Sequence, residues 1–162
     1  MKHIILVRTG DFGDNARLNL TGIAQMEHIA DTISRLFTDI DPSHAIILSS
    51  GTILAQECAD VFFKKLLLTT KIEVVEFLQT GTHDKPKQVC EKIVRYSKRH
   101  PIVIAITQKH NLKELPEQFV KTLETSHKQQ FLNFAYAQTF EKQRGSIISF
   151  DDRNELHGIR PT

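Results

Sequence analysis

Short apolar runs, rich in β-branched residues, alternate along this chain with longer stretches in which apolar residues recur at helical spacing. Apolar runs this short suit strands in a buried sheet, and recurrence every three or four residues suits helices with one buried face. Strands are expected at residues 3–7, 45–49, 72–77 and 102–107. Helices are expected over 20–37, 54–66, 85–98 and 111–123, the last with a break before Pro116. This alternation predicts a sheet covered by helices on both faces.

The C-terminal part has a different pattern. Residues 131–140 and 145–150 are predicted as two strands, joined by a charged turn at 141–144, and would pair antiparallel. The whole chain, residues 1–162, is therefore expected to form one domain. We expect a three-layer α/β/α sandwich with a mostly parallel central sheet and an antiparallel C-terminal strand pair.

The composition limits which binding partners and which cellular compartment are expected. The chain has 21 Lys+Arg and 19 Asp+Glu, a net charge of +2 with no basic stripe, so nucleic acid is not expected as a partner. The apolar run at 4–7 is too short for a signal peptide, and no stretch approaches the ~20 apolar residues of a membrane span. Cys58 and Cys90 lie in predicted helices and are expected to be buried thiols. We expect a cytoplasmic protein without a membrane partner.

Ligands of such sheets bind beyond the carboxyl ends of the strands, where loops and helix N-termini converge. Polar residues close or directly follow four of the predicted strands at these ends. They are Arg8, Thr9, Ser49, Ser50, Glu76, Thr107 and Gln108.

Four sequence blocks at these ends resemble a known family in order and spacing. The first block reads Ile-Ile-Leu-Val-Arg-Thr-Gly at 4–10, and the second reads Leu-Asn-Leu-Thr-Gly-Ile-Ala-Gln at 18–25. The third is Ile-Leu-Ser-Ser at 47–50, followed by Ala55 and Ala59, and the fourth is the strand at 102–108, followed by Leu112. Together they resemble the histidine phosphatase superfamily, the phosphoglycerate-mutase-like group. The short chain looks most like its small phosphohistidine-phosphatase branch.

The resemblance implies a family chemistry from which this chain departs at three positions. The family motif Leu-Val-Arg-His-Gly supplies a histidine that accepts the phosphoryl group, and this chain has Thr9 there. Leu54 stands where the family places a phosphate-clamping arginine, and Gln108 stands where it places a second histidine. A threonine hydroxyl without a base is a weak nucleophile, and its phosphate ester is stable. The family's catalytic set is therefore not intact in this sequence.

The resemblance also implies that part of a phosphate site is retained. Arg8 keeps the family's first clamp, and its guanidinium can bind a phosphate or carboxylate through two hydrogen bonds. Asn15 falls where many members place an asparagine, and Glu76 lies where larger members carry a general-acid carboxylate. Ligand contact and a structural ion pair remain two open interpretations of Arg8. Glu76 facing Arg8 would neutralise the guanidinium.

Other residues could replace the lost chemistry. His110 lies two residues after Gln108, although a histidine in a loop commonly faces solvent, and Lys109 could add positive charge beside the site. The eight histidines include no His-x-x-x-His or His-Glu-x-x-His spacing. We therefore expect neither a metal nor a cofactor.

Three functional hypotheses follow. The first is a catalytically inactive histidine-phosphatase-like protein, a pseudoenzyme, which binds an anionic ligand, a phosphate-containing small molecule or a phosphoprotein through Arg8, Thr9, Asn15 and Gln108. The second is an active phosphomonoesterase or phosphohistidine phosphatase with rearranged residues, in which His110 or Glu76 assists Thr9 or a water molecule. The third is an interaction module that binds a partner through an outer helix or the 131–150 segment.

Overall fold

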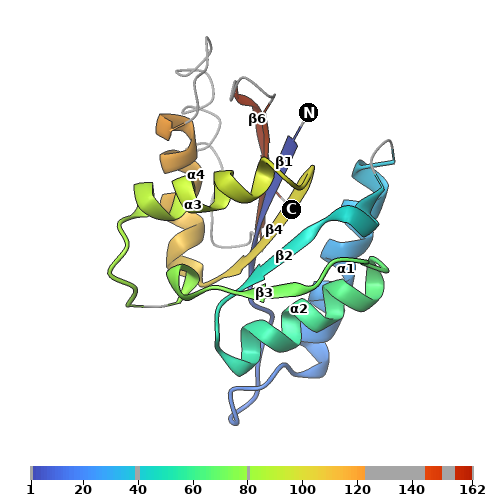
Figure 1. Ribbon diagram of the computed structural model, residues 1–162. Coiled ribbons are helices and arrows are strands. Elements are labelled where there is room, and N and C mark those ends of the chain that lie inside the picture. The colour runs from blue at the N-terminus through green and yellow to red at the C-terminus, as the bar shows by residue number, and fades with distance from the viewer. Residues whose placement is uncertain (1, 39–40, 80, 123–144, 151–155, 162) are drawn as a thin grey trace.

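The computed structural model describes residues 2–38, 41–79, 81–122, 145–150 and 156–161, and these residues form a six-stranded sheet with helices on both sides (Figure 1). The strand order is β3-β2-β4-β1-β5-β6. Neighbours among β1 to β4 run parallel, whereas β5 runs antiparallel to both β1 and β6. The strands are β1 (Lys2–Arg8), β2 (Ile46–Ser49), β3 (Ile72–Val74), β4 (Ile102–Thr107), β5 (Gly145–Phe150) and β6 (Leu156–Pro161).

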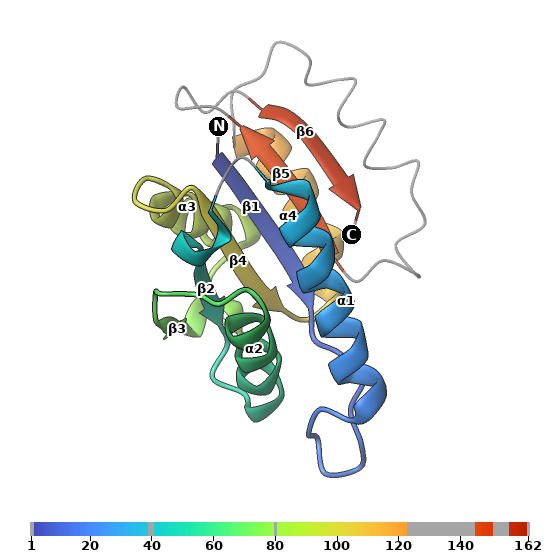
Figure 2. The same cartoon turned by 90° about the vertical axis from the view of Figure 1, so that its right-hand side faces the viewer.

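Two helices cover each face of the sheet, and Figure 2 shows α1 and α2 in front of the strands with α3 and α4 behind them. They are α1 (Leu20–Leu36), α2 (Ile53–Lys65), α3 (Pro86–Ser97) and α4 (Lys109–Thr122). Because alternate strand residues point to opposite faces, Ile4 and Leu6 of β1 belong to the core under α3 and α4, and Ile5 and Val7 to the core under α1 and α2. The predicted three-layer α/β/α architecture is confirmed. Within the described part of the chain, no helix is long and apolar enough to span a membrane.

The third strand is shorter than predicted. The 72–77 run was expected to be one strand, but β3 ends at Val74 and a 3₁₀ turn, η2 (Glu76–Leu78), follows. The N–H of Val75 makes the last bond to β2, donating to the Ser49 carbonyl at 2.8 Å. Leu78 is fully buried in the core under α3 and α4, and the turn brings it there.

Pro116 does not break the last helix, contrary to the sequence prediction. Helix α4 runs from Lys109 to Thr122 with this proline inside it. A proline removes one backbone hydrogen bond from a helix, but Leu115 and Phe119 on either side are buried against the sheet at 1% and 0% exposure. Burial of these two side chains offsets the lost bond.

The C-terminal strands are partly as predicted. The strand at 145–150 is confirmed, and its antiparallel partners are β1 and β6. The strand predicted at 131–140 and the turn at 141–144 lie outside the described residues. Strand β6 was not predicted, because it contains a glycine and a proline, residues that are depleted in strands.

Candidate functional site

The carboxyl ends of β1 and β4 bring together the central residues of the predicted site. Arg8, the last residue of β1, is paired in register with Thr107, the last residue of β4. Thr9 and Gln108 therefore leave the two adjacent strands side by side, and the N–H of Thr9 donates to the Thr107 carbonyl at 3.2 Å. In the first turn of α4, the side-chain amide of Asn111 donates a hydrogen bond to the Thr107 hydroxyl at 2.6 Å.

The backbone N–H groups after β1 are all used inside the protein. Besides that of Thr9, the N–H of Gly10 donates to the Cys58 sulfur at 3.4 Å, and the N–H of Asp11 donates to the Gln25 side chain at 3.0 Å. Many phosphate sites cradle the anion in consecutive free N–H groups. These three N–H groups cannot do so.

Three side chains at this end have uncommitted polar groups. No other described residue makes a hydrogen bond or ion pair with the guanidinium of Arg8, the hydroxyl of Thr9 or the amide of Gln108. Thr9 is only 5% exposed, and Arg8 and Gln108 are half-buried. Buried polar groups in proteins are nearly always hydrogen-bonded to protein, water or ligand. The arrangement therefore leaves donors available for an exogenous acceptor.

Two glycines hold the loop after β1 against the start of α1. A Cβ atom on Gly22 would lie 2.1 Å from the Asp11 carbonyl oxygen, and one on Gly10 would lie 2.8 Å from the Gly22 carbonyl oxygen. Asn19 caps this helix by accepting the Gly22 N–H at 2.8 Å. The absence of side chains at both glycines lets α1 approach closely enough to fix the position of Thr9.

Leu54 packs as a core residue. It lies in the first turn of α2, is 9% exposed and belongs to the apolar cluster under α1 and α2. The nearby serines make hydrogen bonds within their own segment. The Ser49 hydroxyl donates to the Ser50 carbonyl at 3.0 Å, and the Ser50 hydroxyl lies 3.3 Å from the Thr52 hydroxyl. The end of β2 therefore presents no guanidinium to the site.

The side chains of Asn15 and Glu76 lie away from the ends of β1 and β4. The Asn15 side chain is exposed in a turn and accepts the N–H of Arg17 at 3.1 Å. Glu76 follows β3, which is separated from β1 by β2 and β4, so about 14 Å of sheet lies between the strands that precede Glu76 and Arg8. No ion pair joins these two residues in the described structure. The side chains of His110 and Lys109 lie outside the described residues.

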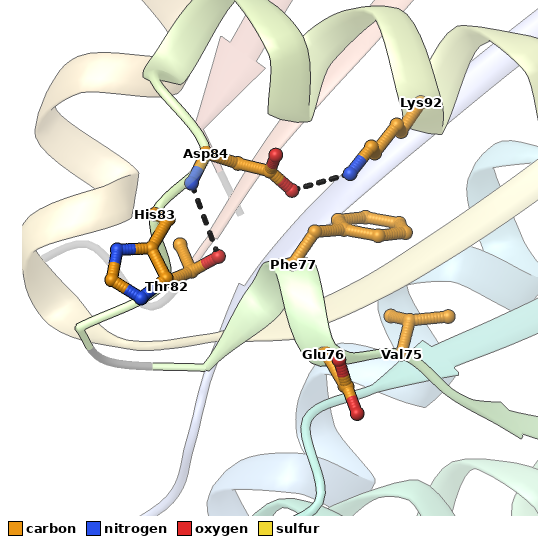
Figure 3. A pocket seen from close by; sticks show the side chains of 7 residues that line it. All are labelled: Val75, Glu76, Phe77, Thr82, His83, Asp84 and Lys92. Carbon is orange, nitrogen blue, oxygen red and sulfur yellow. Dashed lines mark hydrogen bonds and ion pairs between the residues drawn. The ribbon is translucent and has the colours of Figure 1, made fainter.

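Glu76 lines a separate pocket of about 450 Å³ between η2 and the start of α3 (Figure 3). Lys92 reaches into this pocket from α3, with its Nζ 2.5 Å from the Asp84 carboxylate and 5.5 Å from the centre of the Phe77 ring. The ion pair and the cation–π contact hold the lysine in one position. The lining residues are Val75, Glu76, Phe77, Thr82, His83, Asp84 and Lys92.

This pocket was not predicted from the sequence, which gave no element between the strand expected at 72–77 and the helix expected over 85–98. The signal was an acidic residue, Asp84, just before a helix that carries Lys92 two turns later. That spacing allows an ion pair, but only the 3₁₀ turn after β3 brings Phe77 beneath the lysine.

The described residues contain no group of three or more His, Cys, Asp and Glu side chains placed to hold a metal ion. The expectation that no metal takes part remains a prediction.

Cys58 supports the loop after β1 as a neutral thiol. Burial raises its pKa from 9.0 to about 11, against the opposing effect of the Gly10 N–H bond. Burial also raises the pKa of Cys90. Both cysteines are free and buried. Neither thiol has the low pKa of a reactive cysteine.

We therefore expect iodoacetamide at pH 8 to leave Cys58 unmodified in the folded protein and to alkylate it after unfolding in urea, as mass spectrometry would show. The folded thiol titrates near 11 and the unfolded thiol near 9.0, so its contribution to stability is complete below pH 9 and falls as the pH rises to 11. Cys58→Ala should remove that part of the fall. Rapid alkylation of the folded protein would contradict the assignment.

Comparison with protein-family models gives no match, and comparison with curated proteins gives none either. Solved structures do match. The putative phosphohistidine phosphatase SixA from Agrobacterium tumefaciens aligns over 92% of each chain with 14% identity and a TM-score of 0.65. The protein histidine phosphatase SixA complexed with tungstate aligns over 99% of this chain and 94% of its own, with 14% identity and a TM-score of 0.66.

A third match is a phosphoserine phosphatase from Entamoeba histolytica, a mutant with alanine in place of a histidine, in complex with phosphoserine. It aligns over 100% of this chain and 95% of its own, with 13% identity and a TM-score of 0.58. These similarities define the fold as that of the histidine phosphatase superfamily, which includes phosphohistidine phosphatases of the SixA type. The resemblance inferred from the sequence blocks is thereby confirmed for the fold.

Proposed function

We propose that this protein is a catalytically inactive histidine-phosphatase-like protein that binds the phosphate group of a small molecule or a phosphoprotein. The observation that carries the proposal is the set of uncommitted side chains of Arg8, Thr9 and Gln108 at the ends of two adjacent strands. A guanidinium, a hydroxyl and an amide can all donate hydrogen bonds to phosphate oxygens.

Two of the similar structures support binding of a phosphate-like group by this fold. One is a phosphatase complexed with tungstate, an oxyanion with the tetrahedral shape of phosphate. The other binds phosphoserine although one of its histidines has been replaced by alanine. A histidine-to-alanine change on this fold is thus compatible with binding a phosphate ester.

The chemistry of Thr9 supports inactivity. A hydroxyl becomes a useful nucleophile when a base accepts its proton, and no described side chain lies within hydrogen-bond reach of the Thr9 hydroxyl. Leu54 contributes no charge to stabilise a transferring phosphoryl group. Among the described side chains, this site has groups that can hold an anion and none that would cleave its ester.

Binding is tested by titrating the protein with inorganic phosphate and tungstate in a calorimeter and by following its thermal unfolding. We expect both anions to stabilise the protein, by about 2.7 kcal/mol when the anion concentration is 100 times the Kd. Arg8→Gln should weaken binding about 10- to 100-fold, because hydrogen bonds to charged groups contribute about 1.5–3 kcal/mol each.

The matched control is Arg35→Gln, which makes the same change of charge in the last turn of α1, at the opposite end of that helix from the site. This variant should bind phosphate as the unmodified protein does. Equal losses in the two variants would mean that general charge attracts the anion, and unchanged binding in Arg8→Gln would refute the proposed site.

A further inference from the structure

The pocket between η2 and the start of α3 takes no part in the proposed phosphate site, since none of its lining residues belongs to that site. Its volume of about 450 Å³ is in the range of small-molecule sites. Val75 and the ring of Phe77 supply apolar surface, and Glu76 and Asp84 supply carboxylates (Figure 3). A pocket of this kind suits a ligand that has both a hydrocarbon part and a polar group.

The charges in the pocket leave one carboxylate unpaired. The Asp84 carboxylate is neutralised by the Lys92 ammonium, whose Nζ lies 2.5 Å away. Among the described residues, none makes a hydrogen bond or an ion pair with the Glu76 carboxylate. An ionised carboxylate only accepts hydrogen bonds, so the group that Glu76 offers to a ligand attracts a cation with N–H donors.

An organic cation fits this pocket better than a metal ion or an anion. A metal ion needs several ligands close together, and no three His, Cys, Asp or Glu side chains in the described part of the chain are placed to hold one. An anion would meet an ammonium that Asp84 already neutralises, and Glu76 would repel it. The apolar surface beside the carboxylate favours a cation that carries a hydrocarbon chain.

Lys92 shows how an ammonium group is held in this pocket. Its Nζ pairs with Asp84 and lies 5.5 Å from the centre of the Phe77 ring, within the range of cation–π attraction. Lys92 therefore occupies the second carboxylate and the aromatic ring that a cation from outside would otherwise use. It acts as an internal competitor for such a ligand.

We propose that this pocket binds a small aliphatic amine or guanidine. The cationic group donates hydrogen bonds to the Glu76 carboxylate, and the alkyl chain packs against Val75 and Phe77. A free amine and the side chain of a lysine or arginine in a peptide share this chemistry. Because Glu76 is exposed, we expect weak binding that decreases as salt is added.

The test is a titration of isotopically labelled protein with agmatine and putrescine, followed by NMR. We expect the backbone amide signals of residues 75–77 and 82–84 to shift with added amine. Glutarate, a dianion of similar length, should leave these signals unchanged. A blocked tripeptide with a central arginine distinguishes the two sources of the cation: tighter binding than agmatine indicates a peptide side chain, and weaker binding indicates a free amine.

Two variants change the binding of agmatine in opposite directions. Glu76→Gln should weaken it about three- to tenfold, because the variant removes the unpaired charge and keeps the shape of the side chain. Lys92→Met should strengthen it by about the same factor, because the variant removes the competing ammonium and leaves Asp84 and the Phe77 ring available. Circular dichroism would verify that both variants are folded.

The matched controls are Glu91→Gln and Lys87→Met, which make the same changes of charge on α3 outside the pocket. These two residues form an ion pair with each other at 4.0 Å, and both are exposed. Both controls should bind agmatine as the unmodified protein does. Absence of localised shifts, unchanged binding in Glu76→Gln, weaker binding in Lys92→Met, or equal changes in the controls would each overturn the proposal.

Discussion

Gly22→Ala is expected to destabilise the protein by about 2 kcal/mol, although alanine is the better helix former by about 1 kcal/mol. The new Cβ would lie 2.1 Å from the Asp11 carbonyl oxygen, well inside van der Waals contact. That oxygen also accepts the N–H of Asn19 at 3.1 Å, so the loop cannot withdraw without breaking the entry to α1. The steric cost therefore exceeds the gain in helix propensity. Thermal unfolding should show a Tm lower by roughly 4–8 °C.

Gly13→Ala is the matched control in the same loop. The nearest atom to its added Cβ would be the Asn15 Oδ1, 3.5 Å away, which is an ordinary contact. Its Tm should equal or slightly exceed that of the unmodified protein, because alanine reduces the conformational entropy of the unfolded chain. If Gly22→Ala unfolded at the same temperature as Gly13→Ala, the close approach of α1 to the loop would be wrong.

The purified protein is expected to hydrolyse p-nitrophenyl phosphate no faster than buffer. Loss of a catalytic nucleophile in other enzymes lowers kcat about a million-fold, and Thr9 has no base beside it among the described residues. Release of p-nitrophenolate over many hours is the measurement. A phosphohistidine peptide, assayed for released phosphate, extends the test to the substrate class of the similar phosphatases.

Arg8→Ala distinguishes true turnover from a contaminating phosphatase. Trace activity that persists in this variant comes from the contaminant, whereas turnover well above buffer that disappears with Arg8→Ala would overturn the assignment of inactivity. The triple variant Thr9→His, Leu54→Arg and Gln108→His tests the alignment itself. Turnover gained by that variant would place residues 9, 54 and 108 at the family's phosphate-handling positions.

Much of the fold could be predicted from periodicity, because buried strands and one-sided helices leave clear patterns. The limits are instructive at two places. β6 was missed since a strand at the edge of a sheet tolerates glycine and proline that would exclude it from the centre. Pro116 was taken to break α4, whereas burial of its neighbours keeps the helix continuous.

The candidate site was predictable where it depends on strand ends and not where it depends on side-chain partners. Arg8, Thr9 and Gln108 adjoin because parallel strands β1 and β4 end in register. The position of the Asn15 side chain could not be predicted from the sequence, because this side chain accepts a hydrogen bond from the Arg17 N–H within a local turn. Glu76 could have neutralised Arg8 only by facing it, but two strands lie between β1 and β3. Such partners depend on tertiary geometry that no local pattern encodes.

Leu54 occupies a position that is unfavourable for the family's arginine. An arginine restored there would enter a position that is 9% exposed within an apolar cluster, where an unpaired charge is strongly disfavoured. Until an anion is present to neutralise it, the substitution can only weaken the fold. Family chemistry at this position would therefore require the anion, the arginine and the nucleophile together.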